Sequence, residues 1–193
     1  MKSAWLKTLV LLIACMFVPS LALSQEVTQD RIVKGLGKLT SAAPAIDLEI
    51  LRQEAVNGGD KPMSALPNWK RIAKLPQMVV EINFENDSVA IQPQSYRTLG
   101  LLADALHHPN LWDYKFLIVG HASSTGDDKH NLELSEQRAA AIKEALATTF
   151  AVDPQRLYAV GVGEHLPIAG TNAEGSTNRR VQLINLGVFK KKS

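Results

Sequence analysis

Hydrophobic residues between residues 78 and 187 alternate between strand-like and helix-like spacing, and this order constrains the fold more than any other feature. Strands are predicted at residues 78–84, 115–119, 156–162 and 180–186. Helices are predicted from Pro93 to just before Pro109 and from Asp127 to about Phe150. The order β-α-β-α-β-β predicts an α/β domain, an α+β two-layer sandwich in which two helices pack on one sheet through right-handed crossovers.

Local patterns support the individual elements. Residues 78–84 alternate apolar and polar side chains, as in a strand with one buried face, whereas residues 116–119 are continuously apolar and predict burial on both faces. Asp127 precedes the second helix, where its carboxylate can accept hydrogen bonds from the first unpaired amides. The first helix is predicted to bury a stripe made of Tyr96, Leu99, Leu102, Ala103 and Leu106.

Composition and charge exclude several classes of protein. The chain has 193 residues, 46% hydrophobic and 21% charged, which suits one ordinary domain with a leader and a linker. A formal charge of +2 does not favour nucleic acid as a partner. Gly161-Val162-Gly163 is not a dinucleotide fingerprint, because Leu166 stands where a glycine is required. We expect neither a cofactor nor a metal ion.

Residues 1–24 have the pattern of an export signal, with Lys2 and Lys7 before a mostly apolar run. The run from Leu9 to Leu23 is interrupted and shorter than the roughly 20 residues of a membrane span, so no spanning segment is expected after cleavage. The sequence around Cys15 also resembles a lipoprotein signal, which would place an acylated protein at the outer membrane. Simple cleavage is favoured because apolar residues follow the cysteine, and an uncleaved anchor is the third alternative.

Two segments flank the predicted domain at 78–187. Residues 25–77 are predicted to form a loosely packed lead-in with a short helix from Asp30 to Lys34, closed by Gly35 and Gly37. Within it, residues 45–55 fit either a strand or a helix. Residues 188–193 form a basic tail that we expect to be solvated.

Arg138 is the side chain most suited to binding an anion. It lies seven residues after Asn131, about 700° along a helix, so the two residues share one face. No acid lies three or four positions from Arg138, which borders the buried stripe, so its partly desolvated guanidinium can fork onto a carboxylate from elsewhere. The alternative is a solvated arginine, or one that pairs with an acid of another element.

Several spaced motifs make residues 78–187 similar to a known family, the outer-membrane protein A (OmpA)-like domain. The motifs are Gly120-His121, Gly126, Asn131, Leu134-Ser135, Arg138-Ala139, Gly161-Val162-Gly163-Glu164, Pro167 and Asn178-Arg179-Arg180-Val181. The resemblance implies non-covalent binding of peptidoglycan through the free end of diaminopimelate, in the periplasm of the bacterial cell envelope. It also implies that Arg138 and Asn131 belong to the binding site.

One position departs from the family pattern, because Ser123 stands where the family has an aspartate. An ammonium bound by a hydroxyl gains less than one bound by a carboxylate, so binding of the wall is expected to be weakened. By the resemblance, Thr125, Asn86 and Asp87 fall near positions that line the family's pocket. Asp127 and Asp128 lie nearby, but the helix cap is the better explanation for Asp127.

Two other functions remain open. The domain could serve as a protein-interaction module for envelope proteins on the same fold, with its wall-binding pocket lost. A periplasmic hydrolase would need Ser123, His121 and Asp127 as a triad, but no Gly-x-Ser-x-Gly elbow surrounds the serine. We therefore expect a binding protein with no catalytic residues.

Overall fold

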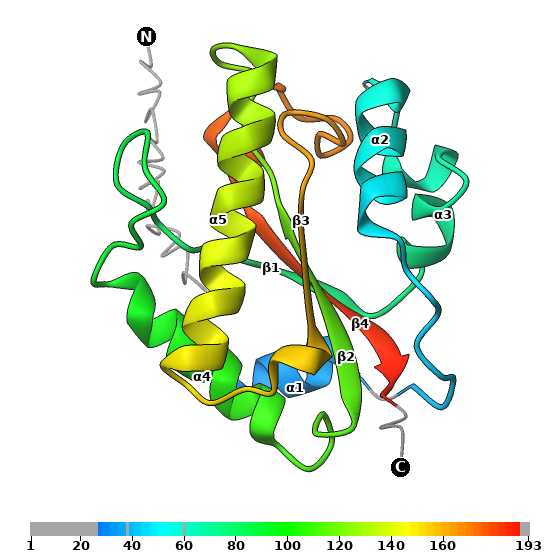
Figure 1. The fold of residues 1–193 in the computed structure, drawn as a ribbon, viewed down its shortest axis with the longest axis vertical. Helices are drawn as coiled ribbons and strands as arrows, with labels where there is room; N and C mark the ends of the chain where they lie inside the picture. Colours follow the sequence, from blue (N-terminus) through cyan, green and yellow to red (C-terminus); the bar gives the residue numbers. More distant parts are fainter. Residues whose placement is uncertain (1–26, 38, 60, 190–193) are drawn as a thin grey trace, which may run out of the picture.

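The computed structural model describes residues 27–37, 39–59 and 61–189, which contain one four-stranded sheet (Figure 1). The sheet has the order β1-β4-β2-β3. Strands β2 and β3 are parallel, and β4 is antiparallel to both β1 and β2. The strands are β1 (Gln77–Val80), β2 (Tyr114–Gly120), β3 (Leu157–Gly161) and β4 (Val181–Val188).

Three helices cover one face of this sheet. They are α1 (Gln29–Leu36), α4 (Ser95–His107) and α5 (Asp128–Thr148), and their buried side chains form a core with Phe116 and Ile118 of β2. Asp127 caps α5 by accepting a hydrogen bond from the amide of His130. The predicted mixed α/β class and the order β-α-β-α-β-β are thus confirmed.

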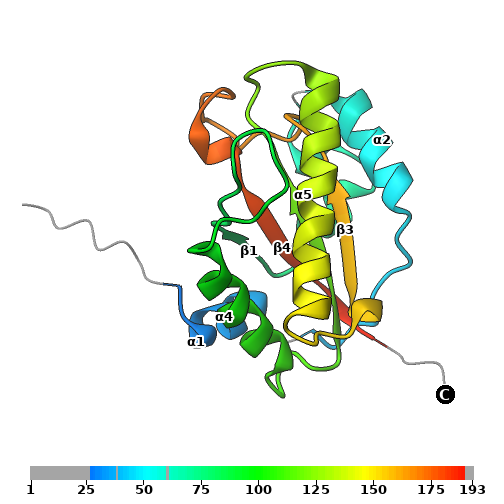
Figure 2. The same ribbon diagram turned by 60° about the vertical axis from the view of Figure 1, so that its left-hand side comes forward.

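The other face of the sheet is covered as well, by α2 (Leu48–Gly58) and α3 (Trp69–Ile72) (Figures 1 and 2). Leu117 and Val119 of β2 point into this second core, where Trp69 is 0% exposed. The Trp69 indole N–H donates to the carbonyl of Leu51. The prediction of a loosely packed lead-in is therefore wrong, and these helices add a third layer to the two that the sequence predicted.

The structure differs from the prediction in two smaller ways, one in β1 and one in α4. Regular pairing of β1 ends at Val80, and Phe84 instead makes an isolated bridge with Ile91. Tyr96 is 43% exposed and leaves the buried stripe. Short 3₁₀ turns connect the elements: η1 (Met63–Ala65), η2 (Pro154–Arg156) and η3 (Ser176–Asn178).

The predicted export signal, Cys15 and the three lysines of the basic tail lie outside the described residues. Within the part that is described, none of the helices combines the length and the apolar character needed to cross a membrane.

Candidate functional site

A cavity of about 840 Å³ lies at the edge of the sheet where β1 and β2 end and β4 begins. Polar loops leave the strands here, and α5 runs alongside, so residues distant in sequence meet. All six residues that the sequence singled out line this cavity: Asn86, Asp87, Ser123, Thr125, Asn131 and Arg138. The structure thus brings the predicted set together.

Close contact between α5 and the sheet fixes the position of the polar face of α5. A Cβ atom on Gly161 would lie 2.1 Å from the amide nitrogen of Glu136, and one on Gly120 would lie 2.3 Å from the carbonyl oxygen of Ser135. The Ser135 hydroxyl accepts a hydrogen bond from the amide of Gly163. Glycines at the ends of β2 and β3 therefore let α5 hold its side chains at the cavity wall.

Arg138 is half-buried and is held by backbone oxygens instead of by an acid. Its Nε donates to the carbonyl of Ser88 at 3.0 Å, and Nη2 donates to the carbonyl of Glu85 at 3.4 Å. Its guanidinium lies 4.9 Å from the centre of the Phe84 ring. Burial lowers the pKa of Arg138; Asp87 opposes this effect and Arg179 adds to it. Neither alternative from the sequence, full solvation or pairing with an acid, describes this side chain.

Asn131 is buried and ties α5 to two loops. Its side-chain N–H₂ donates to a Glu164 carboxylate oxygen at 2.8 Å and to the backbone carbonyls of Ser123 and Thr125. These bonds shape the wall of the cavity. Asn131 therefore has a clear structural role whether or not it also contacts a ligand.

Ser123 is only 2% exposed, and its hydroxyl contacts the side chains of Thr125 and Arg179. Its hydroxyl lies 3.0 Å from that of Thr125 and accepts a hydrogen bond from Nη1 of Arg179 at 3.2 Å. Arg179, which also lines the cavity, was not among the residues predicted from the sequence. The family motif around residues 178–181 was the available signal, but its spacing does not reveal a contact across 56 residues.

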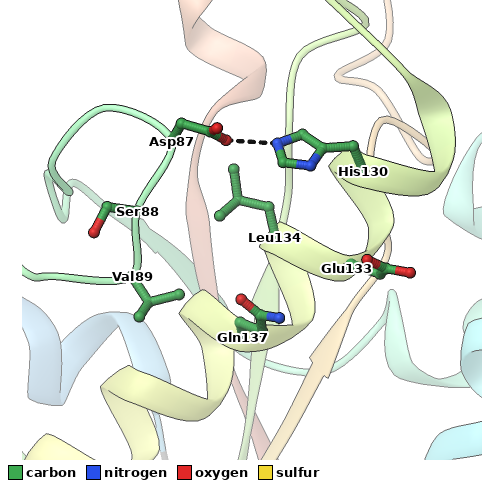
Figure 3. Close-up of a pocket in the computed structure, with 7 residues that line it drawn as sticks. All are labelled: Asp87, Ser88, Val89, His130, Glu133, Leu134 and Gln137. Atoms are coloured by element: carbon green, nitrogen blue, oxygen red, sulfur yellow. Dashed lines mark hydrogen bonds and ion pairs between the residues drawn. The ribbon is translucent and has the colours of Figure 1, made fainter.

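Asp87 links the loop after β1 to α5. Its Oδ1 lies 2.6 Å from Nε2 of His130, and Figure 3 shows this contact beside Leu134. The two residues border a smaller hollow of about 330 Å³ that also includes Ser88 and Glu133. Asp87 has a φ of +47°, a left-handed conformation that is uncommon outside glycine. The contact holds the loop whose carbonyls bind Arg138.

The acids closest in sequence to Ser123 are engaged elsewhere. Asp127 caps α5. Oδ1 of Asp128 lies 3.0 Å from Nε2 of His165, a close contact without hydrogen-bond geometry. Neither aspartate lines the large cavity, so neither replaces the carboxylate that Ser123 lacks.

The geometry does not assemble a hydrolase triad. His121 is buried, its Nε2 lies 3.1 Å from the side-chain oxygen of Gln182, and Ser123 is bonded to Thr125 and Arg179. Burial, with a contribution from Arg180, holds the pKa of His121 well below its usual range. Burial also lowers the pKa of Arg180 to about 10 while it donates to the carbonyl of Leu166, so this arginine braces the loop before β4.

Comparisons with known proteins identify the family of this chain. The sequence matches the OmpA family over residues 83–180, which is more than half of the chain. It is 34% identical over 133 residues to outer membrane protein A of Bordetella avium, covering 67% of each chain. The protein therefore belongs to the OmpA family.

Two further relatives describe the range of the family. Outer membrane porin F of Pseudomonas aeruginosa is 33% identical over 114 residues, which cover 58% of this chain but only 32% of the porin. A peptidoglycan-associated lipoprotein of the same species is 32% identical over 102 residues, covering 52% of this chain and 58% of that protein. The chain thus spans about a third of the porin's length and somewhat more than half of the lipoprotein's.

Two solved structures of OmpA-like proteins are similar to this chain over part of its length. The OmpA-like domain of FopA1 from Francisella tularensis matches with a TM-score of 0.49 and 17% identity, covering 60% of this chain and 77% of that one. The peptidoglycan-associated lipoprotein of Burkholderia pseudomallei matches with a TM-score of 0.43 and 28% identity, covering 58% and 91%.

Proposed function

We propose that this protein binds peptidoglycan non-covalently in the bacterial periplasm, through the acid group of a diaminopimelate residue, and that it catalyses no reaction. The observation that supports this function best is the position of Arg138, half-buried in the wall of the large cavity. An arginine has five N–H donors, and backbone carbonyls take two of those on Arg138. The remaining donors can fork onto a carboxylate in a partly dry site.

The similarity to a lipoprotein named as peptidoglycan-associated supports the same ligand class. Ser123 makes the proposed site weaker than one that carries an acid, because a charged hydrogen bond contributes about 1.5–3 kcal/mol and a neutral one about 1 kcal/mol. The difference corresponds to a loss of affinity for the diaminopimelate ammonium of about twofold to thirtyfold.

Co-sedimentation with purified sacculi tests this function. We expect the parent protein to pellet weakly, Ser123→Asp to pellet more, by about severalfold at subsaturating sacculus, and Arg138→Ala to remain in the supernatant. Arg71→Ala is the matched control, since Arg71 is exposed on α3 and the change removes the same charge. Thermal melts establish that each variant is folded. Equal pelleting of all four proteins would exclude this cavity as the wall site and favour a protein-interaction module.

A further inference from the structure

Two guanidinium groups line the large cavity from different elements. Arg138 belongs to α5, and Arg179 precedes β4 and donates to the Ser123 hydroxyl. Burial lowers the pKa of Arg138 most, Asp87 raises it, and the charge of Arg179 lowers it by a smaller amount, so the two guanidinium groups repel each other weakly. An anion bound near both groups would offset this repulsion.

Neither guanidinium forms an ion pair with a carboxylate in the part of the chain that the structure describes. Among residues 27–37, 39–59 and 61–189, no acid lies within 4.0 Å of either guanidinium. Glu164 accepts from Asn131, and Asp87 contacts His130. Glu81 and Glu85 also line the cavity; both are exposed, as Arg179 is, so water partly screens all three charges.

The Ser123 hydroxyl is a poor receptor for an ammonium group. It is buried, and its oxygen already accepts from Arg179 and contacts the Thr125 hydroxyl. An ammonium bound there would lie beside the Arg179 guanidinium and would be repelled by it. A neutral amide nitrogen in the same place avoids this repulsion, and the carbonyl of that amide can accept from an arginine N–H.

We propose that this cavity prefers a peptidoglycan carboxylate whose neighbouring amine is acylated, as in a cross-linked stem peptide, over the same carboxylate beside a free ammonium. The inference rests on the proposed function and specifies which form of the ligand the site takes. Acylation leaves the carboxylate for Arg138 unchanged and removes only the positive charge that would face Ser123 and Arg179.

Calorimetric titration with two matched probes tests this preference. One probe is a tripeptide, L-alanine–D-glutamate–diaminopimelate, with the side-chain amine free, and the other is the same tripeptide acetylated on that amine. We expect the parent protein to bind the acetylated probe about fivefold more tightly, as expected for removing one partly screened like-charge contact. Ser123→Asp should reverse the order, and Arg179→Gln should reduce the discrimination.

The outcomes separate the inference from the function on which it rests. If the parent protein binds both probes equally, or prefers the free amine, the inference is overturned while peptidoglycan binding stands. If the folded parent binds neither probe, the proposed function and the inference both fail. Loss of binding of both probes in Arg138→Gln, with an unchanged melting temperature, would support the shared carboxylate contact.

Discussion

Arg138 and Arg156 are arginines in two different surroundings. Arg156 is 4% exposed and donates to the carbonyls of Leu106, Leu111 and Tyr114. Its guanidinium thereby satisfies three carbonyls around the start of β2, and burial lowers its pKa. Arg138 also donates to carbonyls, but it borders a cavity. Arg156 is thus almost fully buried with three bonds to the backbone, whereas Arg138 is half-buried with two and has N–H groups left for the proposed ligand.

His121 should make the stability of the protein depend on pH. In the unfolded chain an imidazole gains a proton below about pH 6.5, whereas burial keeps the folded-state pKa of His121 well below that value. The unfolded state therefore binds more protons in this window, and the free energy of unfolding falls as the pH decreases, by at most about 1.4 kcal/mol per pH unit. The loss ends once the pH lies below the folded-state pKa as well.

Urea denaturation from about pH 7 to about pH 5 measures this effect. We expect His121→Gln, which keeps an N–H for Gln182, to lose less stability over this range than the parent protein. If the stabilities of the two proteins fell in parallel, the claim that burial keeps His121 neutral in the folded state would be wrong.

At the scale of elements, the approach of α5 to the sheet determines where the cavity residues lie. Asn131, Ser135 and Arg138 depend on a helix position that only glycine at residues 120 and 161 permits. The sequence predicted these elements because the apolar periodicity of residues 78–187 is long and regular. It could not predict that regular pairing of β1 ends at Val80, since Ile82 is buried outside the strand and preserves the alternation.

Gly161→Ala tests this close approach. The new methyl group would meet backbone of α5, which cannot move aside like a flexible side chain, so we expect a loss of about 1–3 kcal/mol or more in the free energy of unfolding. Gly35→Ala is the matched control, because nothing lies within 4 Å of its Cβ position and it is inside α1; it should be neutral or stabilising by up to about 1 kcal/mol. Similar stabilities for the two variants would contradict the packing described here.

At the scale of the whole molecule, both faces of the sheet are buried under helices, and the N-terminal segment supplies those on one face. The sequence did not reveal this layer, because residues 45–55, where α2 begins, fit either a strand or a helix, and α3 has only four residues and cannot show helical periodicity. The continuous apolar run at residues 116–119 was nevertheless correctly predicted to be buried on both faces. Helical spacing singled out Arg138 and Asn131 and the family resemblance added the other four cavity residues, whereas the contact between Arg179 and Ser123 depends on the folded chain.

The central claim is that Arg138 receives the carboxylate of a peptidoglycan stem peptide, and a double-mutant cycle tests it most directly. The cycle combines Arg138→Gln with a change in the acylated probe, in which the diaminopimelate carboxylate beside the acylated amine becomes a carboxamide. Calorimetry measures all four affinities. We predict a coupling free energy of about 1.5–3 kcal/mol, the range for a charge-assisted hydrogen bond. Additive effects of the two changes, with a coupling near zero, would contradict the account.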